Sequence, residues 1–369
     1  MKQTQLNTFW KLRLTVIVWS AVFLLSACQP GAGNQSTPSE IVAAQAPSAT
    51  LLPTAHSSAD PSLSAETATS TSQPSPTASD TPAPTASPTE DAGFSFVVNG
   101  DTAYHAGEGE FDTPQYFRGM AESIANLPDA RFLVSVGDTD FPADTRWTLD
   151  RYLGEVFLWF PAVGNHELYP DAMDWLNAYP YDLNGDEEPN IVNHGPAGCE
   201  NTTYSFDYQN VHIAVLNIYC DVDNQMRTDG AIVDHLYNWL KADLEATDRE
   251  HIFVVGHEAA FAQPDEDAGI IRWEGEGLDK YPVTRDRFWA LLKEFGVVAY
   301  LHGHSHSYSV TDIDGVWQID TAHSMGARQQ ATRSTYVVIH VQGSSITYET
   351  YRADNITEQY ELTHQGVLR

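Results

Sequence analysis

An abrupt change of composition decides how much of this chain can fold. From Gln29 to about Glu90 the sequence consists mainly of Ser, Thr, Pro and Ala, with few large apolar residues. Such a segment cannot bury enough apolar surface to offset the conformational entropy lost on folding. From Phe94 onward apolar runs are frequent. We therefore predict an extended, disordered linker over 28–92, one folded domain over 93–354 and a C-terminal tail over 355–369.

Short apolar runs alternate with helix-like segments in the predicted domain. Apolar residues at helical spacing indicate helices within 117–127, 232–244 and 288–295. Two stretches, Tyr204–Tyr219 and Ser334–Tyr351, alternate without an intervening helix and so predict antiparallel strand pairs. Strands joined by helices, with antiparallel pairs added, indicate the α/β class. We expect two packed, mixed β-sheets flanked by helices.

The N-terminus has the features of an export signal. Lys2, Lys11 and Arg13 form a positive flank, and Leu14–Leu25 is apolar but too short for a stable membrane anchor. The following LSAC sequence, which ends at Cys28, resembles the lipobox of bacterial lipoproteins, whose cleavage leaves a lipid-modified cysteine. We therefore expect a signal peptide over 1–27, a lipid on Cys28 and an extracytoplasmic, membrane-anchored protein at the cell surface or the periplasmic face.

The charge balance restricts the partners of the protein. Fifty acidic and nineteen basic residues give a formal net charge of -31, and no basic patch is visible in the sequence. Extended nucleic acids bind proteins through contacts between phosphates and basic side chains, so they are not expected as partners. Bound metal ions are the one source of positive field that would let such a surface accept a small phosphorylated molecule.

Two further cysteines, Cys199 and Cys220, flank an apolar stretch with the pattern of a hairpin. In an exported protein thiols can oxidise, so a disulfide between them is the simplest interpretation. Two separate buried thiols are the alternative.

Five polar clusters follow apolar runs that are predicted to be strands. Glycine at such a strand end lets the chain turn sharply beside a ligand, and loops beyond the strand ends form the ligand crevice of open α/β sheets. We therefore expect the five clusters to converge. In chain order they are Gly100-Asp101, Gly137-Asp138, Gly164-Asn165-His166-Glu167, Gly256-His257-Glu258 and Gly303-His304-Ser305-His306.

The clusters supply carboxylates, an amide and imidazoles but no thiolate. This set suits Fe, Zn or Mn, and it is typical of a catalytic site rather than a closed structural zinc site. There are too many donors for one ion. A carboxylate such as that of Asp138 can bridge two ions about 3.5 to 4 Å apart, so we predict two divalent or mixed-valence metal ions.

The order GD, GD, GNHE, GH and GHSH resembles the signature of the calcineurin-like metallophosphoesterases, which include the purple acid phosphatases. The likeness covers about Phe94 to Arg352 and implies a four-layer αββα sandwich with a dinuclear centre. It also implies that His166 faces the substrate, where a histidine can donate a proton or hydrogen bond to the reacting oxygens. A purely structural histidine is the alternative. By resemblance, Asp101 and His306 bind the first metal, Asp138 bridges, and Asn165, His257 and His304 bind the second.

The chain departs from this pattern at two positions. Many members of the family have a histidine two residues after the first aspartate, where this chain has Ala103. Water, Tyr104 or His105 would then have to complete the first metal site. Purple acid phosphatases have a tyrosine where this chain has Phe141, so an iron-tyrosinate colour is not expected.

A weaker motif lies between the third and fourth clusters. Oxygen ligands at alternate positions of Asp182–Asp186 resemble the first half of a calcium loop. Glu187 stands where such loops need glycine, and Asn193 stands where a bidentate glutamate would close the cage. We therefore favour an acidic, solvated insertion over a calcium site.

These features together predict an exported hydrolase of phosphate monoesters or diesters that acts through a metal-bound hydroxide. We expect the segments 168–200 and 263–281 to shape its substrate pocket. Two alternatives stay open: a surface binding lipoprotein that has lost turnover, and a nucleotidase or nuclease. Nothing in the sequence indicates a particular substrate or oligomeric state.

Overall fold

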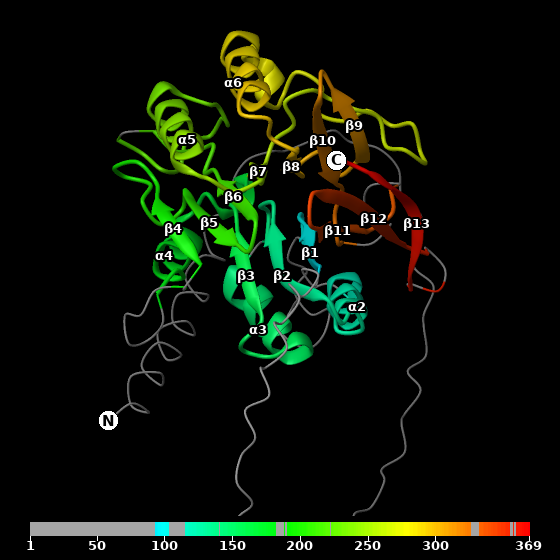
Figure 1. Ribbon diagram of the computed structural model, residues 1–369. Coiled ribbons are helices and arrows are strands. Elements are labelled where there is room, and N and C mark those ends of the chain that lie inside the picture. The colour runs from blue at the N-terminus through cyan, green and yellow to red at the C-terminus, as the bar shows by residue number, and fades with distance from the viewer. Residues whose placement is uncertain are drawn as a thin grey trace, which may run out of the picture. The chain divides into compact units, whose positions relative to one another are not determined.

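The computed structural model describes residues 93–102, 115–139, 141–181, 188, 190–221, 223–325, 332–354, 357 and 359–369. The predictions for Cys28, for Ala103–His105 and for Asp182–Glu187 lie outside these residues. In the described part, two mixed β-sheets pack against each other and helices flank them (Figure 1). The expected α/β class with two mixed sheets is confirmed.

The first sheet has six strands in the order β13-β12-β11-β1-β2-β3. Three neighbours at one side of it, β1, β2 and β3, are parallel, while β11 runs antiparallel to β1 and begins a meander. The strands are β1 (Phe94–Asn99), β2 (Ala130–Ser135), β3 (Leu158–Pro161), β11 (Thr335–Gln342), β12 (Ser345–Ala353) and β13 (Tyr360–Val367).

Strand β13 corrects the prediction of a tail over 355–369. Tyr360–Val367 pairs antiparallel with β12 and forms the edge of the six-stranded sheet. All eight of its residues are exposed or half-buried. An edge strand of this kind needs no apolar face, and for this reason the sequence has no strand signal there.

The second sheet has seven strands in the order β4-β5-β6-β7-β8-β10-β9. Its central strands β6, β7, β8 and β10 are parallel, and the β5–β6 hairpin is antiparallel as expected. The strands are β4 (Ile191–His194), β5 (Tyr204–Tyr208), β6 (Val211–Val215), β7 (His251–Val255), β8 (Ala299–His302), β9 (Tyr308–Ile313) and β10 (Val316–Thr321). Beside this hairpin a disulfide joins Cys199 and Cys220.

The alternation of side chains along the strands produces the layers. Phe96 and Val98 of β1 lie in the apolar core between the sheets, whereas Val97 faces the helices. Along β7, Phe253 likewise faces the core between the sheets, whereas Val254 faces the helices. Core residues of α2 (Gln115–Ile124) and α3 (Pro142–Leu153) pack with the outer face of the six-stranded sheet, and those of α5 (Asp234–Ala246) and α6 (Pro282–Glu294) pack with that of the seven-stranded sheet.

The other helical elements of the described residues are α4 (Pro170–Ala178) and the 3-10 turns η3 (Asn165–Glu167) and η4 (Leu278–Lys280). Among the described helices, none combines the length and the apolar composition that crossing a membrane requires.

Candidate metal centre

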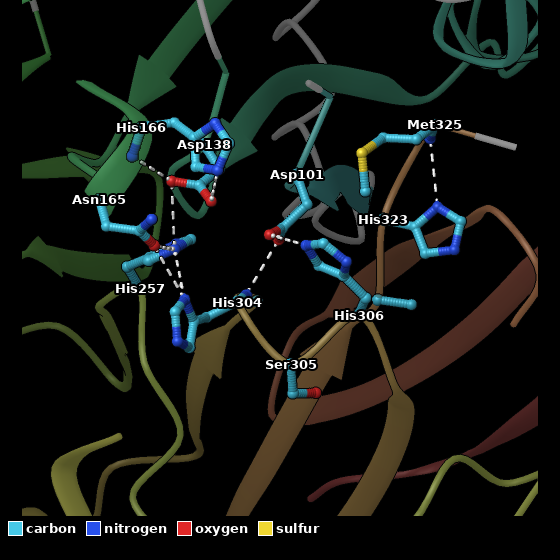
Figure 2. Close-up of polar contacts among 12 residues, drawn as sticks. Asp101, Asp138, Asn165, His166, His257, His304, Ser305, His306, His323 and Met325 are labelled. Carbon is cyan, nitrogen blue, oxygen red and sulfur yellow. Dashed lines mark hydrogen bonds and ion pairs between the residues drawn. The ribbon is translucent and has the colours of Figure 1, made fainter. Parts of the chain in front are cut away.

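The five polar clusters meet where the two sheets pack. Each cluster follows the end of a parallel strand: β1, β2 and β3 in one sheet, and β7 and β8 in the other. Figure 2 shows the side chains of six of their residues turned toward the same region: Asp101, Asp138, Asn165, His257, His304 and His306. Among the side chains of these clusters, two groups have ligand atoms within 4.8 Å of each other, and Asp138 belongs to both. The groups are Asp138, His257 and His304, and Asp101, Asp138 and His306.

In the first group, several donor atoms surround one point. Nε2 of His257 lies 3.3 Å from the Asp138 carboxylate and 3.2 Å from Nδ1 of His304. The amide oxygen of Asn165 lies 3.1 Å from this Nε2 and 2.9 Å from this Nδ1. Four side chains therefore present metal-binding atoms to the same small space.

The second group contains an unsatisfied carboxylate oxygen. Oδ1 of Asp101 lies 3.0 Å from Nε2 of His306, yet this buried oxygen accepts no hydrogen bond from the described residues. The other oxygen, Oδ2, accepts the backbone N–H of His304 at 3.0 Å. A buried carboxylate oxygen without a donor is costly unless a cation binds it, so this group also fits a metal ion.

The backbone is strained at four of the candidate ligands. Asp101, Asp138, His304 and His306 have φ values of 52°, 51°, 65° and 56°, in the left-handed region that residues with a Cβ rarely adopt. Such strain persists only where the surroundings enforce it, and it is concentrated at functional sites. His304 and His306 are therefore loop residues, although their spacing in the sequence matches that of strand residues.

Two glycines leave room for the carboxylates. A Cβ on Gly164 would overlap the Asp138 side chain, and one on Gly303 would overlap the Asp101 side chain. The glycines of the GNHE and GHSH clusters are thus needed for close approach, as expected for glycine beside a ligand.

Hydrogen bonds behind the site orient two of its donors. Nδ1–H of His257 donates to the carbonyl of Val136 at 2.9 Å, which leaves Nε2 to face the centre. The buried Glu167 carboxylate accepts the backbone N–H groups of Asp138 and Gly164 at 2.9 and 2.8 Å. Glu167 therefore ties the turn after β3 to the turn after β2.

His166 lies at the mouth of the site rather than among the ligands. Its backbone N–H donates to Oδ1 of Asp138 at 2.9 Å. Its side chain is 48% exposed, and its Nε2 is 3.8 Å from Oδ2 of Asp138. The imidazole can therefore reach both the centre and a molecule that enters from solvent.

The electrostatics of the site favour a cation. Burial by itself lowers the pKa of His257, but the charge of Asp138, its hydrogen bond and the charge of Asp101 together outweigh it and raise this pKa to about 10. Burial opposes ionisation of Asp138, yet the attraction of His257 holds its pKa below the usual value. Burial and the charge of His257 lower the pKa of His304 to about 4, which keeps this imidazole neutral. A metal ion would compete with the proton on His257 for the same electron pair.

The contacts of two residues beside the ligands could not be predicted from the sequence. Glu167 stood in a recognised cluster, but nothing in the sequence marked its carboxylate as the tie between two turns. His323 follows β10 without a preceding glycine, so it carried no signal. Its ring lies 5.6 Å from that of His306, and its Nδ1 accepts the N–H of Met325 at 3.2 Å (Figure 2).

The segment 168–200, which we expect to shape the substrate pocket, contains α4 and β4. Trp175 and Tyr179 in this segment stack with ring centroids 4.9 Å apart, and both pack against the buried Trp159. Asn193, weighed as the last position of a calcium loop, lies in β4 and donates to Asp243 at 2.7 Å. The Trp175 and Tyr179 side chains therefore belong to the core.

The family of the chain follows from its match to known proteins. Residues 94–308, more than half of the chain, match the model of the calcineurin-like phosphoesterases. This chain belongs to that family. Membership of this family implies that the protein binds divalent metal ions. The two donor groups that share Asp138 fit such ions. No curated protein matches the phosphoesterase in sequence.

Three solved structures illustrate the likeness in fold. GAP50, an anchor in the inner membrane complex of Plasmodium, has 12% identity and a TM-score of 0.49, with 75% of this chain and 89% of that chain covered. PhoD has 10% identity and a TM-score of 0.45, with 74% and 72% covered. A putative 5'-nucleotidase from Staphylococcus aureus has 15% identity and a TM-score of 0.40, with 75% and 54% covered. At these values the similarities do not bear on activity.

Proposed function

We propose that this phosphoesterase holds two metal ions, hydrolyses small phosphate esters, and is exported and anchored by a lipid on Cys28. The hydrolase proposal depends above all on one observation, the place of Asp138 in both donor groups. A carboxylate in that place can bridge two cations, and paired ions promote in-line displacement at phosphorus.

Each candidate ligand then has a role. Asp101 and His306 would hold one ion with Asp138, while Asn165, His257 and His304 would hold the other with the same carboxylate. The imidazole and carboxylate donors suit Fe, Zn or Mn. When bound, the ions supply Lewis acidity toward water and toward the phosphoryl oxygens.

His166 serves the substrate rather than the metals. Its backbone N–H is held by Asp138 while its imidazole is half exposed at the mouth of the site. In this place it would donate a hydrogen bond or a proton to the leaving oxygen as negative charge develops there.

The substrate is a small phosphorylated molecule. With a formal net charge of -31 the protein surface repels anions, so a phosphate ester gains attraction only at the metal centre. Long nucleic acids would need a basic surface as well.

A substrate panel combined with metal analysis tests this proposal. The full-length chain is assayed with p-nitrophenyl phosphate and bis(p-nitrophenyl) phosphate after addition of Mn²⁺, Zn²⁺ or Fe²⁺, and bound metal is quantified. We expect hydrolysis, up to two ions per chain, and a loss of at least about 100-fold in His257→Ala, because outer-shell partners alone cost up to that much.

His340→Ala is the matched control, because His340 lies outside both donor groups and pairs with Glu349. It should retain wild-type activity. No hydrolysis of any ester with any of the metals, in a chain that still binds them, would favour the alternative of a binding lipoprotein.

Export and lipidation have a separate test. Cells that express the chain are labelled with a radioactive fatty acid, and membrane and soluble fractions are compared. Cys28→Ser should remove the label and release the protein from the membrane. A labelled Cys28→Ser variant would refute the anchor without affecting the proposal of hydrolysis.

A further inference from the structure

The segment 263–281 between β7 and α6 brings an exposed tryptophan to the metal centre. The Trp273 ring lies 5.8 Å from the ring of His304, one of the candidate ligands, at an angle of 36°. Trp273 is nevertheless 49% exposed. Its ring therefore borders the site and still offers surface to an entering molecule.

Trp273 is held there at a cost in backbone energy. Its φ of 56° lies in the left-handed region, which a bulky residue seldom occupies. The turn is anchored because Asp279 accepts the N–H groups of Gly275 and Gly277 at 2.8 and 3.1 Å, and Leu278 is buried. Leu278 N–H also donates to the carbonyl of Ala259 at 3.0 Å, two residues after His257.

The neighbouring Arg272 is a cation without a carboxylate partner among the described residues. Its guanidinium carbon lies 5.9 Å from the Trp273 ring, and it makes no hydrogen bond or ion pair with a described side chain. Partial burial lowers the pKa of its guanidinium, and the negative charge of Asp101 acts against this shift. In a protein with a large excess of acidic residues, an unpaired arginine beside a metal centre is available to an anion.

We infer that Trp273 and Arg272 form the leaving-group side of the site and select phosphate esters whose leaving group carries a planar ring. The ring stacks on the exposed face of Trp273, and the guanidinium of Arg272 binds an anionic oxygen of the substrate. The inference rests on the proposed function and adds to it a substrate class, which includes both aryl and nucleoside phosphates.

Binding of phosphonates, which are substrate analogues without a hydrolysable ester bond, tests the subsite without turnover. The affinities of phenylphosphonate and methylphosphonate for the full chain loaded with Mn²⁺ are measured by titration calorimetry. We expect the wild type to prefer the phenyl compound about 10-fold, the size of a good stacking contact. Trp273→Ala should remove this preference without weakening methylphosphonate, and Trp273→Phe should retain most of it.

Arg272→Ala should weaken both phosphonates by a similar factor of about 10, because the lost contact is to the shared anionic group. Arg272→Lys should restore part of the loss. Trp147→Ala is the matched control, because Trp147 is a similarly exposed tryptophan, on α3, and should leave both affinities unchanged.

A second pair of ligands separates the two sources of a planar ring. Adenosine monophosphate is compared with ribose 5-phosphate in wild type and Trp273→Ala. A preference for the nucleotide that depends on Trp273 and exceeds the phenyl preference assigns the subsite to nucleobases, and the reverse assigns it to aryl groups.

Three results would overturn the inference. The first is a phenyl preference that is unchanged in Trp273→Ala. The second is an equal loss of affinity for both phosphonates in that variant, which would mean that Trp273 only positions His304. The third is no binding of either compound to the wild type. Failure of the proposed function looks different, because then the esters are not hydrolysed although the Trp273-dependent preference persists.

Discussion

The two sheets contribute different chemistry to the site. The six-stranded sheet supplies only oxygen donors, through Asp101, Asp138 and Asn165. The seven-stranded sheet supplies only imidazoles, through His257, His304 and His306. Each donor group combines a carboxylate that follows the first sheet with an imidazole that follows the second, so the candidate centre exists only where the two sheets pack.

The packing between the sheets is therefore part of the site. Phe160 of the six-stranded sheet stacks on Phe206 of the seven-stranded sheet with ring centroids 3.6 Å apart, and Phe132 meets Phe206 edge-on at 5.5 Å. This aromatic core sets the distance at which the two kinds of donor face each other. The loops supply the ligands, while the core supplies their separation.

The largest effect is expected at the carboxylate that both donor groups share. Asp138→Ala should lower hydrolysis by at least about 1000-fold, because several kcal/mol of charge stabilisation depend on the ions it bridges. Metal analysis should show loss of both ions. Retention of two ions in this variant would break the comparison, because the donor groups would then be independent.

The next effect should be confined to one donor group at a time. His306→Ala and Asn165→Ala each remove one donor from a single group, so each should lose one ion and about 100-fold in activity. Metal content measured after dialysis shows whether a variant has lost one ion or both. If either variant loses both ions together, the centre is one cooperative unit rather than two adjacent sites.

A smaller effect is expected at Glu167, which holds the two turns that carry the oxygen donors Asp138 and Asn165. Glu167→Ala removes the acceptor for the N–H groups of Asp138 and Gly164 and should cost about 10- to 100-fold in metal affinity. Glu167→Gln keeps one oxygen for these donors and should stay within a few-fold of wild type. Equal losses in both variants would contradict a positioning role.

The smallest effect concerns an imidazole of the seven-stranded sheet outside the site. Burial opposes protonation of His212, but hydrogen bonds to Asp243 and Asp207 outweigh it and raise its pKa. Arg249 also pairs with Asp207, at 2.8 Å. A raised pKa stabilises the fold fully below the unfolded value of about 6.5, and this stability is lost as the pH rises through the folded value.

Urea unfolding of wild type and His212→Gln between pH 5 and 9 measures the contribution of protonated His212 to the free energy of unfolding. The difference in unfolding free energy between the two proteins should shrink as the pH rises. A difference that is independent of pH would show that folding does not raise the pKa of His212.

Much of the fold was readable from the sequence because its signals are local. The apolar runs at Phe94, His251 and Ala299 became β1, β7 and β8, and the helical spacing before Leu244 became α5. The prediction was wrong at β13, whose exposed edge position gives no apolar alternation. Local patterns also do not reveal that Trp175 and Tyr179 pack against the core, because burial of an aromatic side chain depends on distant partners such as Trp159.

The sequence by itself determined the donor types, their order along the chain and the glycines that let them turn beside a ligand. Those properties depend on residue identity and short-range backbone preferences. Only the tertiary structure decided that Asp138 lies in both groups, that Glu167 ties two turns, and that Trp273 and Arg272 border the centre. The reason is physical: these contacts join residues of different strands and loops, and the packing of two sheets sets their distances.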